Sequence, residues 1–88
     1  MNERRLETII KGFANKRRIL VLQYLGAHPE ADLGEVANMI KLDITTVSEH
    51  VRKMAIAGLV MKRNEGSRVC HALTKRGKSV LMFLKNMQ

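Results

Sequence analysis

The segment from residue 43 to residue 60, DITTVSEHVRKMAIAGLV, combines side chains that form hydrogen bonds with apolar ones at helical spacing. At 100° per residue, one face of such a helix would be apolar, made of Ile44, Val47, Val51, Met54 and Ala55. The opposite face would be polar and holds Thr45, Thr46, Glu49, Arg52 and Lys53, with Ser48 and His50 on the flanks. Hydroxyl, ammonium and guanidinium groups donate to phosphate oxygens and to the edges of purine bases. The polar face is therefore a candidate nucleic-acid contact.

The charge of the chain is distributed unevenly. The formal net charge is +8, from 16 basic and 8 acidic residues. Residues 1–50 hold seven of each sign, whereas residues 51–88 hold nine basic residues and a single acid, Glu65. An excess confined to one half indicates a polyanionic partner, either nucleic acid or, as the weaker alternative, an anionic membrane surface.

Length and composition restrict the class of protein. The 88 residues suffice for one domain, and with 3% aromatic residues its core must be aliphatic. Cys70 is the only cysteine, so no internal disulfide can form, as is usual in a reducing cytoplasm. No apolar run reaches the ~20 residues of a membrane helix, and no signal-peptide pattern opens the chain. We expect a soluble, cytoplasmic protein that does not enter the membrane.

Catalytic and ligand-binding patterns are sparse. There is no Gly-rich phosphate loop, no HExxH motif and no nucleophile beside a base, so we expect no enzyme and no cofactor. Cys70 and His71 are adjacent and would point to opposite faces of a strand, and His28 is distant, so we expect no metal site. No small-molecule effector is evident from the residue types.

The spacing of apolar residues, together with the capping and turn residues, predicts four helices, then a β-hairpin, then a last helix. The first helix spans residues 3–12; the second, capped by Asn15, stops at Gly26 and buries Ile19, Leu20, Leu22 and Leu25. Asp32 and Asp43 cap the third and fourth helices, and Thr74 caps a last helix over residues 75–87. Between them, strands at 59–63 and 68–73 flank the four-residue loop NEGS. The predicted fold is mainly α with a small β-hairpin, a winged helix-turn-helix.

The stretch LGEVANMIKLDITTVSEHVRKMAIAGLV resembles the helix-turn-helix of the ArsR/MarR-like winged-helix transcription regulators. The family phrase S-x-H-Φ-x-x-Φ-x-x-A-G-Φ-V, with Φ apolar, stands here as Ser48, His50, Val51, Met54, Ala57, Gly58, Leu59 and Val60. The likeness covers residues 13–84. It implies one DNA-binding domain over 1–88, with the helix-turn-helix at 33–57 and the wing at 59–73. It also implies that residues 44–57 enter the major groove of double-stranded DNA. The regulator would repress or activate by occupying an operator, and repression is the favoured interpretation.

Site residues follow from this resemblance together with their types. We expect bases to be read by Thr45, Thr46, Ser48, Glu49 and Arg52. We expect phosphates to be held by Lys53, Lys62, Arg63 and Arg68, and more weakly by Arg17, Arg18, Lys75 and Arg76. Glu49 could accept from a cytosine amine, but pairing with Arg52 or Lys53 is the favoured interpretation. For His50 we favour a hydrogen bond to phosphate or to a neighbouring element.

The last helix is more apolar than one contact face requires, which indicates a homodimer. The terminal helices, 1–12 and 75–88, would form its interface through Leu6, Ile9, Ile10, Leu81, Leu84 and Met87. Two alternatives stay open. The outward position of Ile56 favours a winged-helix module that binds another protein. A sequence-neutral architectural or RNA-binding protein would also explain the charge.

Overall fold

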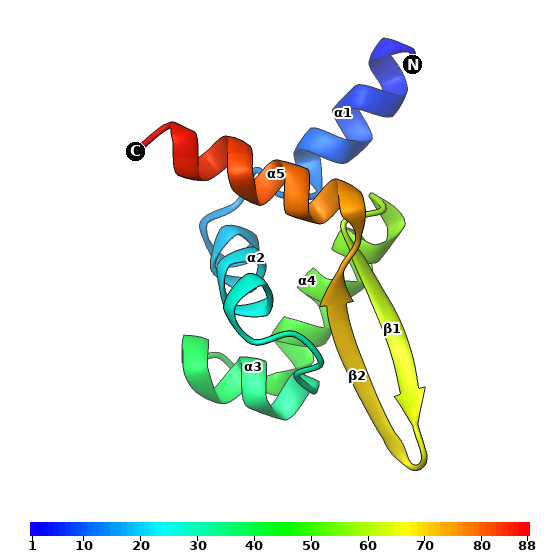
Figure 1. Cartoon of the computed structure of the whole chain (residues 1–88), viewed down its shortest axis with the longest axis vertical. Coiled ribbons are helices and arrows are strands. Elements are labelled where there is room, and N and C mark those ends of the chain that lie inside the picture. The colour runs from blue at the N-terminus through cyan, green and yellow to red at the C-terminus, as the bar shows by residue number, and fades with distance from the viewer.

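The computed structural model describes residues 1–88 and contains five helices and one antiparallel hairpin. The elements are α1 (Glu3–Lys11), α2 (Lys16–Ala27), α3 (Leu33–Ile40), α4 (Ile44–Ile56), β1 (Val60–Glu65), β2 (Arg68–Leu73) and α5 (Lys75–Asn86). Helices α2, α3 and α4 pack together, the hairpin extends from one side of them, and α5 crosses over α2 (Figure 1). The mainly α winged helix-turn-helix expected from the sequence is confirmed.

Side-chain caps fix the beginnings of the helices where the sequence places them. The side chains of Asn15, Asp32 and Asp43 accept from backbone N–H groups at the starts of α2, α3 and α4. Thr74 does the same for α5, accepting from the Gly77 N–H at 3.0 Å. Such a cap contributes about 0.5–2 kcal/mol, because it satisfies a backbone donor that the helix leaves unpaired.

Several boundaries differ from the prediction by one or two residues, and two of these differences have a clear physical cause. Helix α2 does not stop at Gly26 but continues through Ala27. It ends because Pro29 excludes helical geometry at the preceding residue, and His28 has φ −132° and ψ 73°. The hairpin turn has two residues, Gly66 and Ser67, rather than four, since the strands pair as far as Glu65 with Arg68. Gly66 supplies the positive φ, 62°, that this tight turn requires.

One aliphatic core joins all of the elements, and it corrects three sequence assignments. Leu20, Ile44 and Ala55 are exposed, whereas Val21 is fully buried. The run ILVL in α2 is apolar at four successive positions, so its period alone cannot identify the buried face. In α4, the buried side chains are Val47, Val51 and Met54, whereas Ile44 lies at the exposed beginning of the helix.

Helix α5 lies so close to Leu59, the residue before β1, that a glycine is required in the helix. A Cβ atom on Gly77 would overlap the backbone carbonyl oxygen of Leu59. That carbonyl also accepts from the Thr74 N–H at 3.0 Å, so it is not free to move aside. Gly77 is therefore needed for close approach.

Replacing Gly77 with Ala should lower the free energy of unfolding by about 1–3 kcal/mol or more, because the core must shift to admit the methyl group. Urea unfolding followed by circular dichroism measures this. The matched control is Gly34→Ala in α3, where the added Cβ meets only the Asp32 carboxylate, at 3.3 Å. The control should be neutral or slightly stabilising. Equal stability of the two variants would show that α5 does not pack as described.

Candidate nucleic-acid interface

The outward face of α4 carries the polar side chains predicted for it. Thr45, Ser48, Glu49, Arg52 and Lys53 are exposed. Thr46 is half-buried, and its hydroxyl donates to Asp43 Oδ2 at 2.9 Å. The hydroxyl proton of Thr46 is thus occupied by the helix cap, and Thr46 can offer a base only an acceptor. The remaining side chains leave a contiguous donor-rich surface.

Arg52 and Glu49 form an ion pair across one turn of α4. Arg52 Nη2 lies 2.5 Å from Glu49 Oε1, and Nε lies 3.3 Å from Oε2. The hydrogen bonds from Arg52, and then its charge, lower the pKa of the Glu49 carboxyl. The pairing favoured from the sequence is confirmed. It holds the guanidinium group on the outward face, where a base edge could also meet it.

The start of α2 lies against the other flank of α4. Arg18 Nε donates to His50 Nδ1 at 3.2 Å, and Arg18 Nη1 donates to the Lys11 carbonyl at 2.7 Å. Burial, and then the charges of Arg18, Arg17 and Lys53, lower the pKa of His50, so the neutral ring can accept this hydrogen bond. The expected contact of His50 with a neighbouring element is confirmed. Arg18 is directed inward by it, whereas Arg17 is exposed.

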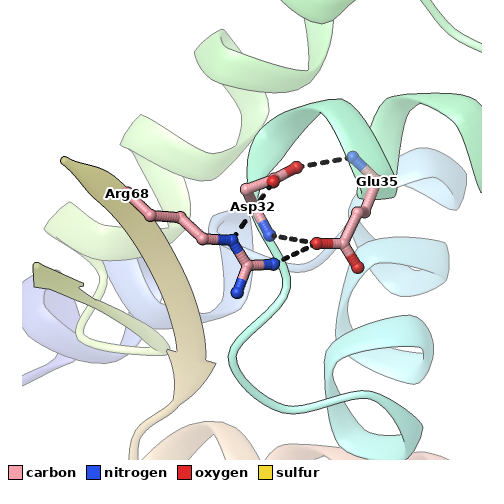
Figure 2. A network of polar contacts seen from close by, with 3 residues as sticks. All are labelled: Asp32, Glu35 and Arg68. Atoms are coloured by element: carbon pink, nitrogen blue, oxygen red, sulfur yellow. Dashed lines mark hydrogen bonds and ion pairs between the residues drawn. The ribbon is translucent and has the colours of Figure 1, made fainter. Parts of the chain in front are cut away.

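The wing, predicted at 59–73 and formed in the structure by residues 60–73, contacts the start of α3 and the loop before it through ion pairs that the sequence does not predict. Arg68 contacts both carboxylates of the α3 capping box: its Nε lies 3.5 Å from Asp32 Oδ2, and Nη2 contacts Glu35 Oε1 (Figure 2). On the other strand, Arg63 Nη1 lies 2.5 Å from Glu30 Oε1. The charges of both arginines are therefore offset within the chain, and each would have to leave a carboxylate before it could hold a phosphate; their role as phosphate contacts stays a prediction. Lys62 forms no ion pair in the structure.

Two of the predicted phosphate contacts, Lys75 and Arg76, lie at the start of α5, and only Lys75 is exposed. Arg76 Nη1 lies 3.4 Å from the carbonyl of Ala57, at the end of α4, where a positive charge stabilises the exposed carbonyl groups. Lys75 is exposed. Among the predicted phosphate contacts, those free of carboxylates and exposed are thus Arg17, Lys53, Lys62 and Lys75.

The predicted dimer face is narrower than the sequence suggested. Ile9 and Leu81 are buried in the core of their own chain, so they cannot cover a partner. Leu84 is half-buried, whereas Leu6, Ile10 and Met87 are 45%, 52% and 70% exposed. Most of α1 projects away from the body of the molecule (Figure 1), and Ile9 is its only buried residue. The exposed apolar side chains of α1 and of the end of α5 form the uncovered part of this face.

Other candidate sites receive little support from the geometry. Cys70 is a free, fully buried thiol. No group of three or more His, Cys, Asp and Glu side chains is arranged to hold a metal ion. The helices are all too short or too polar to cross a bilayer.

Comparison with known proteins places this geometry among DNA-binding proteins. The sequence pattern of the winged helix-turn-helix DNA-binding family matches residues 15–61. The HTH-type transcriptional regulator YgaV of Escherichia coli is 22% identical over 80 residues, which cover 90% of this chain and 81% of that protein.

Solved structures agree over almost the whole chain. HlyU of Vibrio cholerae superposes with a TM-score of 0.84 at 26% identity, covering 99% of this chain and 97% of that one. The homodimeric winged helix-turn-helix DNA-binding domain of Mb0332 from Mycobacterium bovis gives a TM-score of 0.81 at 26% identity, covering 94% and 76%. The sequence resemblance described above is thereby confirmed.

Proposed function

Because this chain belongs to the winged helix-turn-helix DNA-binding family, a family of DNA-binding proteins rather than enzymes, we propose that it is a transcription regulator that reads a specific double-stranded site. The observation that carries the proposal is the outward face of α4, which is hydrophilic, rich in donors and uncovered by the rest of the chain. A B-DNA major groove, ~12 Å wide, admits one α-helix. We take α4 as the recognition helix and the wing as a contact to the backbone or minor groove.

The side chains divide into two roles. Thr45 and Ser48 lie in the first half of the recognition helix, where base edges are met, and Arg52 with Glu49 offers a donor fork beside an acceptor. Lys53, Lys62 and Arg17 meet phosphates on either side of the groove, with Lys75 as a further candidate. By occupying its site, the protein acts as a repressor.

A homodimer completes the proposal. Its support is the uncovered apolar face of α1 and α5 in this chain, together with the homodimeric state of the Mb0332 domain. A two-fold dimer places two recognition helices roughly 34 Å apart, one turn of B-DNA, and so reads a palindromic site.

Selection of bound sequences from a random duplex library tests the proposal directly and should return a palindromic consensus. On that consensus, Arg52→Ala should cost about 1–3 kcal/mol of binding free energy and relax the preference at one base position in each half-site. Lys53→Ala is the matched control, because a lost phosphate contact weakens binding to all sequences evenly. An even loss for Arg52→Ala would make Arg52 a phosphate contact.

The exposed Ile56 favours a second candidate function, a module that binds another protein. Its side chain is 60% exposed at the end of the recognition helix, where a polar residue would be expected. A gel shift with random duplex at low salt separates the candidates, because a protein-binding module without affinity for DNA gives no shift. Salt-dependent binding with no consensus would instead indicate a sequence-neutral nucleic-acid binder.

A further inference from the structure

The face of the wing opposite the recognition helix lines an apolar groove. Side chains alternate between the two faces of a strand, so Met61 and Arg63 of β1 lie on one face and Lys62 on the other. Lys62 and the buried His71 line a separate cleft beside the recognition helix. Met61 and Arg63 instead border a groove of about 450 Å³ between the hairpin, the end of α2 and α5. A groove in this position stays open when the recognition helix is on DNA.

The groove has a buried aliphatic floor and an exposed, flexible rim. Its floor includes Leu25, Leu73 and Leu81, each of which is no more than 8% exposed. At its rim, Met61 and Met82 are 43% and 59% exposed. Methionine side chains are flexible and polarizable, and they are over-represented on surfaces that bind peptides of varied shape. The groove therefore suits the apolar side chains of a peptide.

The unpaired charges of the groove are all positive. Lys78 and Lys85 of α5 line it, are exposed and form no ion pair. The carboxylate in the lining, Glu30, already pairs with Arg63, whose Nη1 lies 2.5 Å from Glu30 Oε1. An occupant that carries carboxylates beside its apolar side chains is therefore complementary to this groove, whereas a basic occupant is repelled.

The groove and the predicted dimer face lie on different flanks of α5. At 100° per residue, Met82 lies about 140° around the helix from Met87, which belongs to the exposed apolar end of α5. Lys78 and Lys85, in contrast, both lie within about 60° of Met82. A second copy of the chain on the dimer face would therefore leave the groove uncovered.

We propose that this groove docks an acidic amphipathic helix of a partner protein, with its apolar side chains between Met61 and Met82 and its carboxylates on Lys78 and Lys85. Amphipathic helices bind apolar grooves through side chains at positions i, i+3, i+4 and i+7. The charge pairs are exposed to solvent, so the binding is weak and falls with salt. Docking needs no DNA and does not rest on the proposed function. Together with that function, it would bring the partner to the DNA site.

The probe is a fluorescein-labelled synthetic helix of about 14 residues, with Leu at positions i, i+3, i+4 and i+7 and Glu at most of the others. One counterpart has Gln in place of every Glu, and a second has the acidic composition in scrambled order. Fluorescence anisotropy with the full chain, without DNA, should show saturable binding of the acidic helix. Its affinity should be at least about tenfold higher than that of either counterpart.

Substitutions in the chain locate the binding site. Met82→Glu should weaken binding of the acidic helix by at least about tenfold, because it places a like charge at the rim. The matched control is Met39→Glu on α3, which is 58% exposed, lies outside the groove and should keep the affinity. Lys78→Gln and Lys85→Gln should each weaken binding about two- to fivefold. Lys16→Gln removes an exposed cation from α2 and should leave the affinity unchanged.

Absence of saturable binding, equal affinity for the scrambled helix, or equal losses in Met82→Glu and Met39→Glu would overturn the docking site. Adding the acidic helix to the protein–duplex complex should leave the Kd for DNA unchanged. A raised Kd would mean that the helix occupies the DNA-binding cations instead of the groove, which also overturns the proposal. Monomers of Met82→Glu in analytical ultracentrifugation would assign the groove to a second copy of the chain, with the same consequence. If the helix binds the groove and no duplex binds under any condition, the proposed function fails and the docking site stands.

Discussion

Raising the salt concentration from about 50 mM to about 200 mM should weaken binding of the dimer to its duplex by roughly 10³-fold. Each protomer presents Arg17, Lys53 and Lys62 around the recognition helix, exposed and free of carboxylates. A dimer would then neutralise about six phosphates and release their counterions, so log affinity should fall with log salt at a slope near −5. Fluorescence anisotropy with a labelled consensus duplex gives the slope.

Charge-removing variants identify which cations contribute. Lys53→Gln and Lys62→Gln should each flatten the slope by about 2, because each removes two contacts from the dimer. Lys85→Gln should leave it unchanged, since the C-terminal end of α5 and the wing tip lie at opposite ends of the molecule (Figure 1). A slope near −9 would mean that Arg63 and Arg68 also leave their carboxylates for phosphates. A flat dependence would contradict the DNA-binding surface as a whole.

Replacing Ile10 with Glu should convert the dimer into monomers and weaken binding to a palindromic duplex by about 10²–10⁴-fold. Ile10 is 52% exposed on α1, so the charge is tolerated by the free chain but not in a covered apolar interface. A monomer holds only one half-site, and the effective concentration of the second recognition helix is lost. Analytical ultracentrifugation gives the oligomeric state, and anisotropy gives the affinity.

The matched control is Ile10→Met, which keeps the position apolar and should preserve both the dimer and the affinity. Circular dichroism should show the same helix content for both variants, because Ile10 is 52% exposed and is not part of the hydrophobic core. An Ile10→Glu variant that remains dimeric would place the interface on another surface. A monomeric variant with undiminished affinity would show that one protomer suffices for the site.

The charge asymmetry of the sequence overestimates the free positive charge of the wing. From the sequence, four cations of the recognition helix and the wing are expected to hold phosphates: Lys53, Lys62, Arg63 and Arg68. In the structure the carboxylates that offset two of them come from the first half of the chain, 33 residues away for both Arg63–Glu30 and Arg68–Glu35. The sequence pattern Asp32-x-x-Glu35 is typical of a capping box, which the structure contains. This pattern indicates that two carboxylates lie together at the start of α3. Nothing in the pattern indicates that β2 passes beside it.

Features that depend on interactions between residues close in the sequence could be predicted from the sequence alone. Helix starts follow from caps within three residues, and the outward face of α4 follows from a period of 3.6 residues, so Thr45, Glu49, Arg52 and Lys53 could be assigned before the fold was known. Properties that depend on residues far apart in the sequence could not be predicted in this way. Whether Val21 or Leu20 enters the core, whether Arg68 is free or paired, and whether His71 is buried beside a cleft are decided by segments brought together only on folding. Burial and ion pairing join residues that are close in space but far apart in the sequence. The residues next to a position in the sequence therefore do not reveal whether its side chain is buried or paired.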